Sequence, residues 1–412
     1  MKNIIINNSD RFKSVFVGVN LLLPLTGEEN SKNALLAMVL KKSCSKFESQ
    51  KDLDRTLAGL YDTNLDMSVE KLDNLYNIQC NMELLNIEYM GKENVDKACE
   101  ILYSTLLSPN IHDGKFEQTI FDREKETLIE KIKEERDDKK RYALKELEKD
   151  MFNGTVYEIS SLGTIEDLQN ISNKDLVKHY YSILERAEIV VSACGNLNGM
   201  QDIFEKIYNK LTGECGKHVV ENKQEVNTIG EIVYREEVQD IAQSVLTIGL
   251  KVEDAKKEDV YALLVYNSLL GGTPASKLFQ NVREKESLAY FAKSMYNRYK
   301  SAIYMYAGVD PNKAKKAQEV MLKQLQLIQN RQVTDEEFDA AKQYIISSYN
   351  ELQDSKMSTA KTMLNNEIFF EKTVEIEEMI KAIENITKED IFEVAQKVKA
   401  TNIFLLGGVS NG

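Results

Sequence analysis

Apolar and polar positions along this chain alternate in a way that predicts two similar halves. Near the start, the apolar and β-branched run Val15–Leu23 predicts a strand, and the segment from Ser31 to Lys42 predicts a helix. The same order returns later, with Ser244–Leu250 as the strand and Val260–Leu270 as the helix. Both halves are therefore expected to begin with a strand followed by a helix.

The ends of the two halves also match. The heptapeptides NISNKDL and NITKEDI contain Ser172 and Thr387, each three residues before an aspartate and ahead of an apolar-periodic run. This spacing predicts a helix N-cap at both positions, because the hydroxyl can accept a backbone N–H of the first turn. Each predicted helix leads into a strand-like run, Ala187–Cys194 in the first half and Asn402–Leu406 in the second.

Strands and helices in this order predict an α+β fold built from two duplicated domains. We expect the first domain at residues 1–216 and the second at residues 229–412. Residues 217–228 lack an apolar period and are rich in polar residues, so they are the predicted linker.

Composition and net charge argue against nucleic-acid and membrane partners. The chain has 412 residues, of which 42% are apolar and 29% charged, which is typical of a soluble globular protein. Its formal net charge is −13, and because phosphate binding needs a basic face we expect no nucleic-acid partner. No run approaches the roughly 20 apolar residues that a membrane helix needs, so we expect no membrane partner.

The cysteines indicate the compartment. There are five, widely spaced and without a CxxC pair, which predicts free thiols in a reducing environment. We therefore expect the protein in the cytoplasm.

The sequence contains few motifs that are typical of metal-binding or catalytic sites. Its three histidines, His112, His179 and His218, are far apart, and no HxxxH, HxxEH or HxH occurs. GxSxG, P-loop and GxGxxG motifs are also missing. His179 lies in an apolar-periodic segment, where a packed histidine is the simplest interpretation. The residue patterns alone do not indicate an enzyme.

One long segment points to a family. Leu270–Tyr290 reads LGGTPASKLFQNVREKESLAY, with Gly271, Gly272 and Ser276 ahead of Arg283 and Tyr290. It resembles the second-domain signature of the M16 (pitrilysin-like) zinc peptidases, in which a glycine-rich turn and a Ser-x-Leu-Phe helix start precede an arginine and, seven residues later, a tyrosine.

The resemblance extends over nearly the whole chain, through RFKSVFVGVN near the start, Leu106–Pro109 and Gly163–Glu166. It implies the LuxS/MPP-like metallohydrolase fold, in which each of two duplicated domains is a mostly antiparallel sheet packed with helices.

The first half departs from the family pattern. Active members carry HxxEH on the first helix and a further glutamate ligand on a later helix. The resemblance places Ala34, Ala37 and Met38 at the three HxxEH positions and Lys131 at the later glutamate. Zinc hydrolysis needs three protein ligands and an open water position. These side chains supply neither ligands nor a base, so we expect no metal and no cofactor in this chain.

In the family, the arginine and tyrosine of the second domain bind substrate and help to stabilise the oxyanion. Some bacterial members divide the work between two chains, one with HxxEH and one with the Arg–Tyr pair. The resemblance thus implies that this chain is the zinc-less subunit of a heterodimeric peptidase. Arg283 and Tyr290 would bind an unfolded peptide, and an HxxEH-bearing M16 paralogue would hold the zinc.

Two alternatives remain open at this point. The chain could be a non-enzymatic scaffold of the same fold, or a stand-alone peptide-binding or chaperone-like module. The presence of both Arg283 and Tyr290 favours the split peptidase, but fold alone does not determine function.

Overall fold

The computed structural model describes residues 2–47, 49–214 and 230–408. The chain forms two compact units. Unit 1 consists of Met1–Lys133, Ile159–Gln224 and Leu352–Val374, and unit 2 consists of Glu134–Glu158, Glu225–Glu351 and Glu375–Gly412. The predicted linker 217–228 lies outside the described residues.

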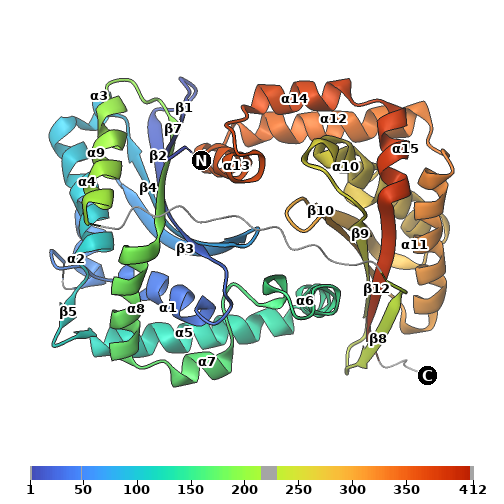
Figure 1. The fold of residues 1–412 in the computed structure, drawn as a ribbon, viewed down its shortest axis with the longest axis horizontal. Helices are drawn as coiled ribbons and strands as arrows, with labels where there is room; N and C mark the ends of the chain where they lie inside the picture. Colours follow the sequence, from blue (N-terminus) through green and yellow to red (C-terminus); the bar gives the residue numbers. More distant parts are fainter. Residues whose placement is uncertain (1, 48, 215–229, 409–412) are drawn as a thin grey trace. The chain divides into compact units, whose positions relative to one another are not determined.

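Unit 1 is built on one five-stranded sheet with the strand order β1-β7-β2-β4-β3 (Figure 1). Its strands are β1 (Ile4–Asn8), β2 (Ser14–Pro24), β3 (Asn64–Leu72), β4 (Leu75–Leu85) and β7 (Glu188–Gly195). β1 and β7 run parallel, and the other neighbours are antiparallel. A small hairpin adds β5 (Ile111–His112) and β6 (Lys115–Phe116). β2 is almost wholly buried, as its continuous apolar run predicts.

Helices lie on both faces of this sheet. They are α1 (Asn30–Leu40), α2 (Gln50–Gly59), α3 (Ile87–Met90), α4 (Lys92–Leu107), most of α5 (Gln118–Asp137), α7 (Ile165–Asn170), α8 (Asn173–Arg186), α9 (Gln201–Glu214) and α13 (Lys356–Phe370). Helix α1 packs against β3 and β4, whereas α13 packs against β7, β1 and β2.

Unit 2 repeats this architecture with the strand order β10-β11-β9-β12-β8. Its strands are β8 (Val233–Val238), β9 (Ser244–Val252), β10 (Ala289–Asn297), β11 (Ala302–Val309) and β12 (Val398–Gly407). Its helices are α6 (Lys139–Met151), α10 (Val260–Asn267), α11 (Ala314–Gln329), nearly all of α12 (Asp335–Leu352), α14 (Ile376–Asn385) and α15 (Lys388–Lys397). β8 and β12 are parallel and the other pairs antiparallel, as in unit 1. The α+β class and the two mostly antiparallel sheets are therefore confirmed.

The predicted N-caps are confirmed too. The Ser172 hydroxyl accepts the backbone N–H of Asp175 at 3.2 Å and begins α8. Thr387 begins α15 in a complete capping box, since the Asp390 carboxylate also accepts the Thr387 N–H at 2.8 Å. The two helices lead into β7 and β12, the strands that occupy matching positions in the two sheets.

Each unit contains one helix from the other half of the chain. Helix α6 belongs to unit 2, where Ala143, Leu147 and Met151 form an apolar stripe buried with Tyr304 and Phe404 of the sheet. Helix α13 belongs to unit 1, where Ala360 packs with Phe16 and Cys194. The compact units thus differ at these helices from the predicted domains 1–216 and 229–412, because contacts rather than chain order group them.

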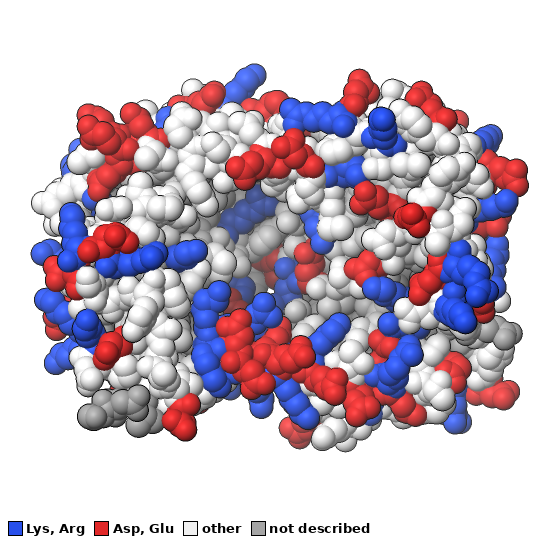
Figure 2. Space-filling view, turned by 180° about the vertical axis from the view of Figure 1, so that it is seen from behind, with Lys and Arg blue, Asp and Glu red and all other residues white. Residues whose placement is uncertain are grey.

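Charged side chains of both signs are scattered over the surface, among many uncharged residues (Figure 2). On the face that Figure 2 shows, Lys and Arg lie interspersed with Asp and Glu. Within the part of the chain that the structure describes, no helix combines the length and the apolar content needed to cross a membrane.

Candidate functional site

The segment from Ser268 to Tyr290, which follows α10 and ends in β10, contains all five residues of the motif that the sequence analysis singled out in the second half. It begins with a π-helical stretch, Ser268–Gly272, and continues into a second one, Phe279–Lys285, before β10 starts at Ala289. π-Helical turns are rare and often occur at functional sites, because they redirect side chains within a helix.

Gly271 and Ser276 give this segment its shape. A Cβ on Gly271 would lie 2.5 Å from the backbone nitrogen of Ser294, so only glycine allows the segment to approach β10 this closely. The buried Ser276 hydroxyl donates to the carbonyl of Thr273 at 2.5 Å and closes the turn before the second π-helical stretch. Gly272 is less constrained. A Cβ on Gly272 would lie 3.3 Å from its nearest neighbour, the Asn267 carbonyl oxygen.

Arg283 projects from the second π-helical stretch toward solvent. Its side chain is 44% exposed, and its Nε lies 3.5 Å from a carboxylate oxygen of Glu284. The guanidinium stacks over the ring of Phe279, with the carbon Cζ 4.7 Å from the ring centroid. No other partner of this guanidinium is found among the described residues, so most of its N–H groups are available to a ligand.

Tyr290 is displaced from the regular ladder of β10. Ala289 pairs with Val309 and Phe291 with Gly308, so Tyr290 is the extra residue of a β-bulge on this edge strand. A bulge changes the direction of its side chain, and bulges are frequent next to active sites. Tyr290 is 69% exposed, which is a large value for an aromatic side chain.

Arg283 and Tyr290 line the same pocket, which has a volume of about 470 Å³. The lining residues are Arg283, Glu284, Ser287, Leu288, Ala289, Tyr290, Asp310 and Lys313. Ser287 has a φ of 49°, a left-handed conformation that is uncommon outside glycine and that turns the chain between the two predicted site residues. All the lining residues belong to unit 2. The structure therefore brings the predicted Arg–Tyr pair together at one concave surface.

Two lining residues, Asp310 and Lys313, lie outside the Leu270–Tyr290 segment that the sequence analysis singled out. Asp310 follows β11, and its side chain accepts the backbone N–H of Asn312 at 2.9 Å. Lys313 reaches the pocket because β11 pairs with β10, and its Nζ donates to the Ser287 carbonyl at 3.2 Å. The pairing of the two strands decides this proximity, and no local motif signals it.

In the first half, the predicted zinc positions divide between two helices. Ala34 and Ala37 lie on α1 and are each 2% exposed, and Met38 next to them is half-buried. Lys131 and its neighbour Glu130 lie on α5 and are exposed. This set of side chains offers no nitrogen, oxygen or thiolate ligand from α1, so it does not fit zinc. Among the described residues there is no group of three or more His, Cys, Asp or Glu that could hold a metal ion.

His179 lies close to α1 but acts as a packed residue. Its Nε2 is 2.7 Å from Oδ1 of Asn33, and its side chain is 5% exposed. Burial lowers the pKa of His179 to about 4, although the nearby Glu29 carboxylate acts in the opposite direction. The interpretation of His179 as a packed histidine is confirmed.

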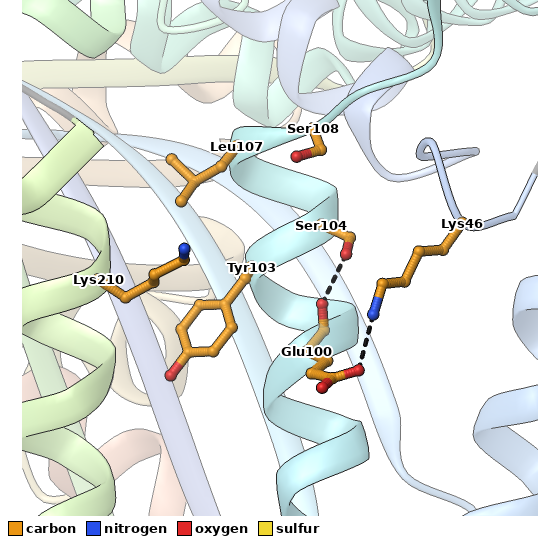
Figure 3. Close-up of a pocket in the computed structure, with 7 residues that line it drawn as sticks. All are labelled: Lys46, Glu100, Tyr103, Ser104, Leu107, Ser108 and Lys210. Carbon is orange, nitrogen blue, oxygen red and sulfur yellow. Dashed lines mark hydrogen bonds and ion pairs between the residues drawn. The ribbon is translucent and has the colours of Figure 1, made fainter.

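A second pocket, of about 500 Å³, lies between α4 and α9 in unit 1 (Figure 3). On one side of α4, Lys46 pairs with Glu100 at 2.7 Å, and Ser104 donates to the Glu100 carbonyl at 2.8 Å. Tyr103 and Lys210 lie on the other side of the helix. Lys46, Glu100 and Ser104 in this pocket already bond to one another or to the backbone, so they are less available to a ligand. The pocket with Arg283 and Tyr290 is therefore the stronger candidate.

Comparisons with known proteins show what this chain is similar to. Residues 170–345, which include the whole Leu270–Tyr290 segment, match the family described as "Peptidase M16 inactive domain". This chain therefore contains a segment that matches an M16 peptidase inactive domain. Among curated M16 relatives, the Bacillus subtilis protein called "Probable inactive metalloprotease YmfF" is 28% identical over 408 residues, covering 97% of this chain and 94% of the relative. The Bacillus subtilis "Uncharacterized zinc protease YmxG" is 25% identical and covers 71% of each chain.

Solved structures show the same M16 fold over nearly the full chain. A conserved protein from Enterococcus faecalis V583 superposes with a TM-score of 0.89 at 26% identity, covering 99% of this chain and 97% of that one. A peptidase M16 inactive domain from Pseudomonas fluorescens superposes with a TM-score of 0.79 at 14% identity, covering 98% and 96%, and so supports the fold alone.

Proposed function

We propose that this chain is the zinc-less, peptide-binding subunit of a two-chain peptidase that processes or degrades small peptides. Its partner would be an M16 paralogue that carries HxxEH and supplies the zinc. Arg283 and Tyr290 would bind the peptide backbone at the scissile carbonyl. The observation that carries this proposal is the pocket in which Arg283 and Tyr290 are both exposed.

The chemistry of the pocket suits a peptide ligand. A guanidinium and a phenol hydroxyl both donate hydrogen bonds, and a peptide carbonyl accepts them. Donors fixed in advance around a developing oxyanion are each worth about 3 kcal/mol in a transition state. The motif residues Gly271 and Ser276 hold the segment in shape, so the exposed donors are positioned before any ligand arrives.

The first half supports a division of labour. The α1 positions offer two buried alanines and a methionine where a hydrolytic zinc site needs ligands and a base. In addition, Bacillus subtilis contains one relative named as an inactive metalloprotease and another named as a zinc protease. Two such relatives in one organism are what a paired system requires.

The test is to co-express this chain with an HxxEH-bearing M16 paralogue from the same genome. Cleavage of a quenched peptide library would be measured for each chain alone and for the pair, with and without a chelator. We expect chelator-sensitive cleavage by the pair only. Arg283→Ala should reduce that cleavage about 100-fold, the typical cost of one oxyanion donor.

Matched controls come from the same unit. Arg331 is exposed and pairs with Glu389, and Tyr344 on α12 is 49% exposed, so neither lines the pocket. Arg331→Ala and Tyr344→Phe should leave cleavage unchanged, whereas Tyr290→Phe should lower it about tenfold. A pair that never associates, or cleavage that ignores Arg283 and Tyr290, would favour the scaffold or the stand-alone binding module.

A further inference from the structure

The charges in the Arg283–Tyr290 pocket are unevenly paired. The two carboxylates that line it are engaged locally, Glu284 with the Nε of Arg283 and Asp310 with the backbone N–H of Asn312. The two cations are less engaged. Within the part of the chain that the structure describes, Arg283 has no carboxylate partner besides its sequence neighbour Glu284, and Lys313 has none.

Lys313 contacts the backbone of its own unit and also lines the pocket, where it can contact a ligand. Its only hydrogen bond among the described residues goes to the neutral carbonyl of Ser287, at 3.2 Å, so no carboxylate pairs directly with its ammonium group, although Asp310 lines the same pocket. The same contact connects Lys313 to the left-handed turn at Ser287, which links Arg283 to Tyr290. Lys313 is exposed, and the ammonium group has two further N–H donors.

We propose that Lys313 binds a carboxylate of the peptide whose backbone Arg283 and Tyr290 hold, so that the pocket selects peptides with a carboxylate near the bound segment. This inference rests on the proposed function and specifies its substrate class. The carboxylate can come from the C-terminus of the peptide or from an aspartate or glutamate side chain. Both sources present the same charged acceptor to the ammonium group of Lys313.

The experiment measures binding of fluorescein-labelled, unstructured peptides of one parent sequence to the full chain, alone and with its HxxEH-bearing partner. One peptide has an amidated C-terminus and no acidic residue, the second has a free C-terminus, and the third is amidated with one internal glutamate. We expect the neutral peptide to bind more weakly than at least one of the others. The peptide that binds better identifies the source of the carboxylate.

The variant series separates charge from structure. Lys313→Gln should weaken binding of the preferred carboxylate peptide about 3- to 10-fold, the range for one half-exposed ion pair with good hydrogen-bond geometry. The same variant should leave binding of the neutral peptide unchanged, and Lys313→Arg should restore the preference. Lys316→Gln is the matched control, because Lys316 is exposed nearby but lines a different pocket with Lys285. Thermal unfolding of each variant would show that the fold is kept.

The outcomes are distinct. Equal binding of all three peptides, or an equal effect of Lys313→Gln on all of them, would overturn carboxylate recognition and leave the proposed function intact. Binding of none of the peptides, by the chain or by the pair, would overturn both.

Discussion

The segments that join β2 to β3 in unit 1 and β9 to β10 in unit 2 occupy matching places in two sheets of the same strand order, yet only the second leads to an exposed Arg–Tyr pair at a pocket. After β2, helix α1 is buried on nearly all sides and places Ala34 and Ala37 in the core. After β9, the buried helix α10 takes the place of α1, and only then does the chain pass through two π-helical stretches and expose Arg283 and Tyr290 at a pocket. The comparison teaches that the duplicated architecture keeps a packed helix in both units and varies the segment between that helix and the edge strand.

The largest expected effect comes from placing a carboxylate in the packed helix. Ala37→Glu should lower the free energy of unfolding by about 4 kcal/mol, because a buried charge without a partner is not compensated by solvation. Urea denaturation would measure this loss. Lys131→Glu is the control, since Lys131 is exposed on α5 and the change should stay within about 0.5 kcal/mol. Equal stability of the two variants would mean that α1 is less tightly packed than its burial indicates.

A pH titration tests the same packed region. The pKa of His179 is lowered from 6.5 to about 4 by burial, so between these values the unfolded chain binds more protons than the folded chain. Stability from this residue is complete above pH 6.5 and falls as the pH decreases toward 4, by about 3 kcal/mol in total.

His179→Gln should remove this part of the pH dependence when the free energy of unfolding is measured between pH 4 and 7. The charged neighbours Glu29, Lys32 and Arg186 stay in place in the variant, and they also act on the His179 pKa. An unchanged pH profile in the variant would show that other groups cause the acid sensitivity.

The glycine pair of unit 2 should give a smaller, graded effect. Gly271→Ala brings a Cβ to within 2.5 Å of the Ser294 backbone nitrogen, and it should lower the free energy of unfolding by about 2 kcal/mol. Gly272→Ala meets its nearest atom at 3.3 Å and should cost about 0.5 kcal/mol or less. Chemical denaturation of both variants would check the ranking, and a reversed order would contradict the close approach of this segment to β10.

The smallest effect on stability is expected at the exposed pair. Arg283→Ala and Tyr290→Phe should each change the free energy of unfolding by no more than about 0.5 kcal/mol, because both side chains are largely exposed. Thermal unfolding measures this directly. A large loss at either position would give that residue a structural role and weaken the contrast between the two regions.

Much of the fold followed from local patterns. Apolar runs located β2 and β9, and the hydroxyl–aspartate spacing located the starts of α8 and α15. These features depend on residues that are close in sequence, and their periods and caps can be recognised without a structure. The Leu270–Tyr290 segment likewise indicated the family, which the comparisons confirmed.

Other features could not be predicted in this way. The grouping of α6 with unit 2 and of α13 with unit 1 depends on which apolar side chains pack together, and the apolar period of a helix does not say which sheet it meets. The bulge at Tyr290 depends on the register between β10 and β11. The position of Lys313 next to Ser287 depends on the same register between β10 and β11.

The sequence by itself determined the duplicated α+β architecture, the family and the absence of zinc-ligand chemistry at Ala34, Ala37 and Met38, since each is a property of residue types in a fixed order. Only the tertiary structure decided that Arg283, Tyr290 and Lys313 share one pocket and that two helices change units. The physical reason is that strand register and helix packing are decided by contacts between distant segments, and the free energy of those contacts is not encoded in any local pattern.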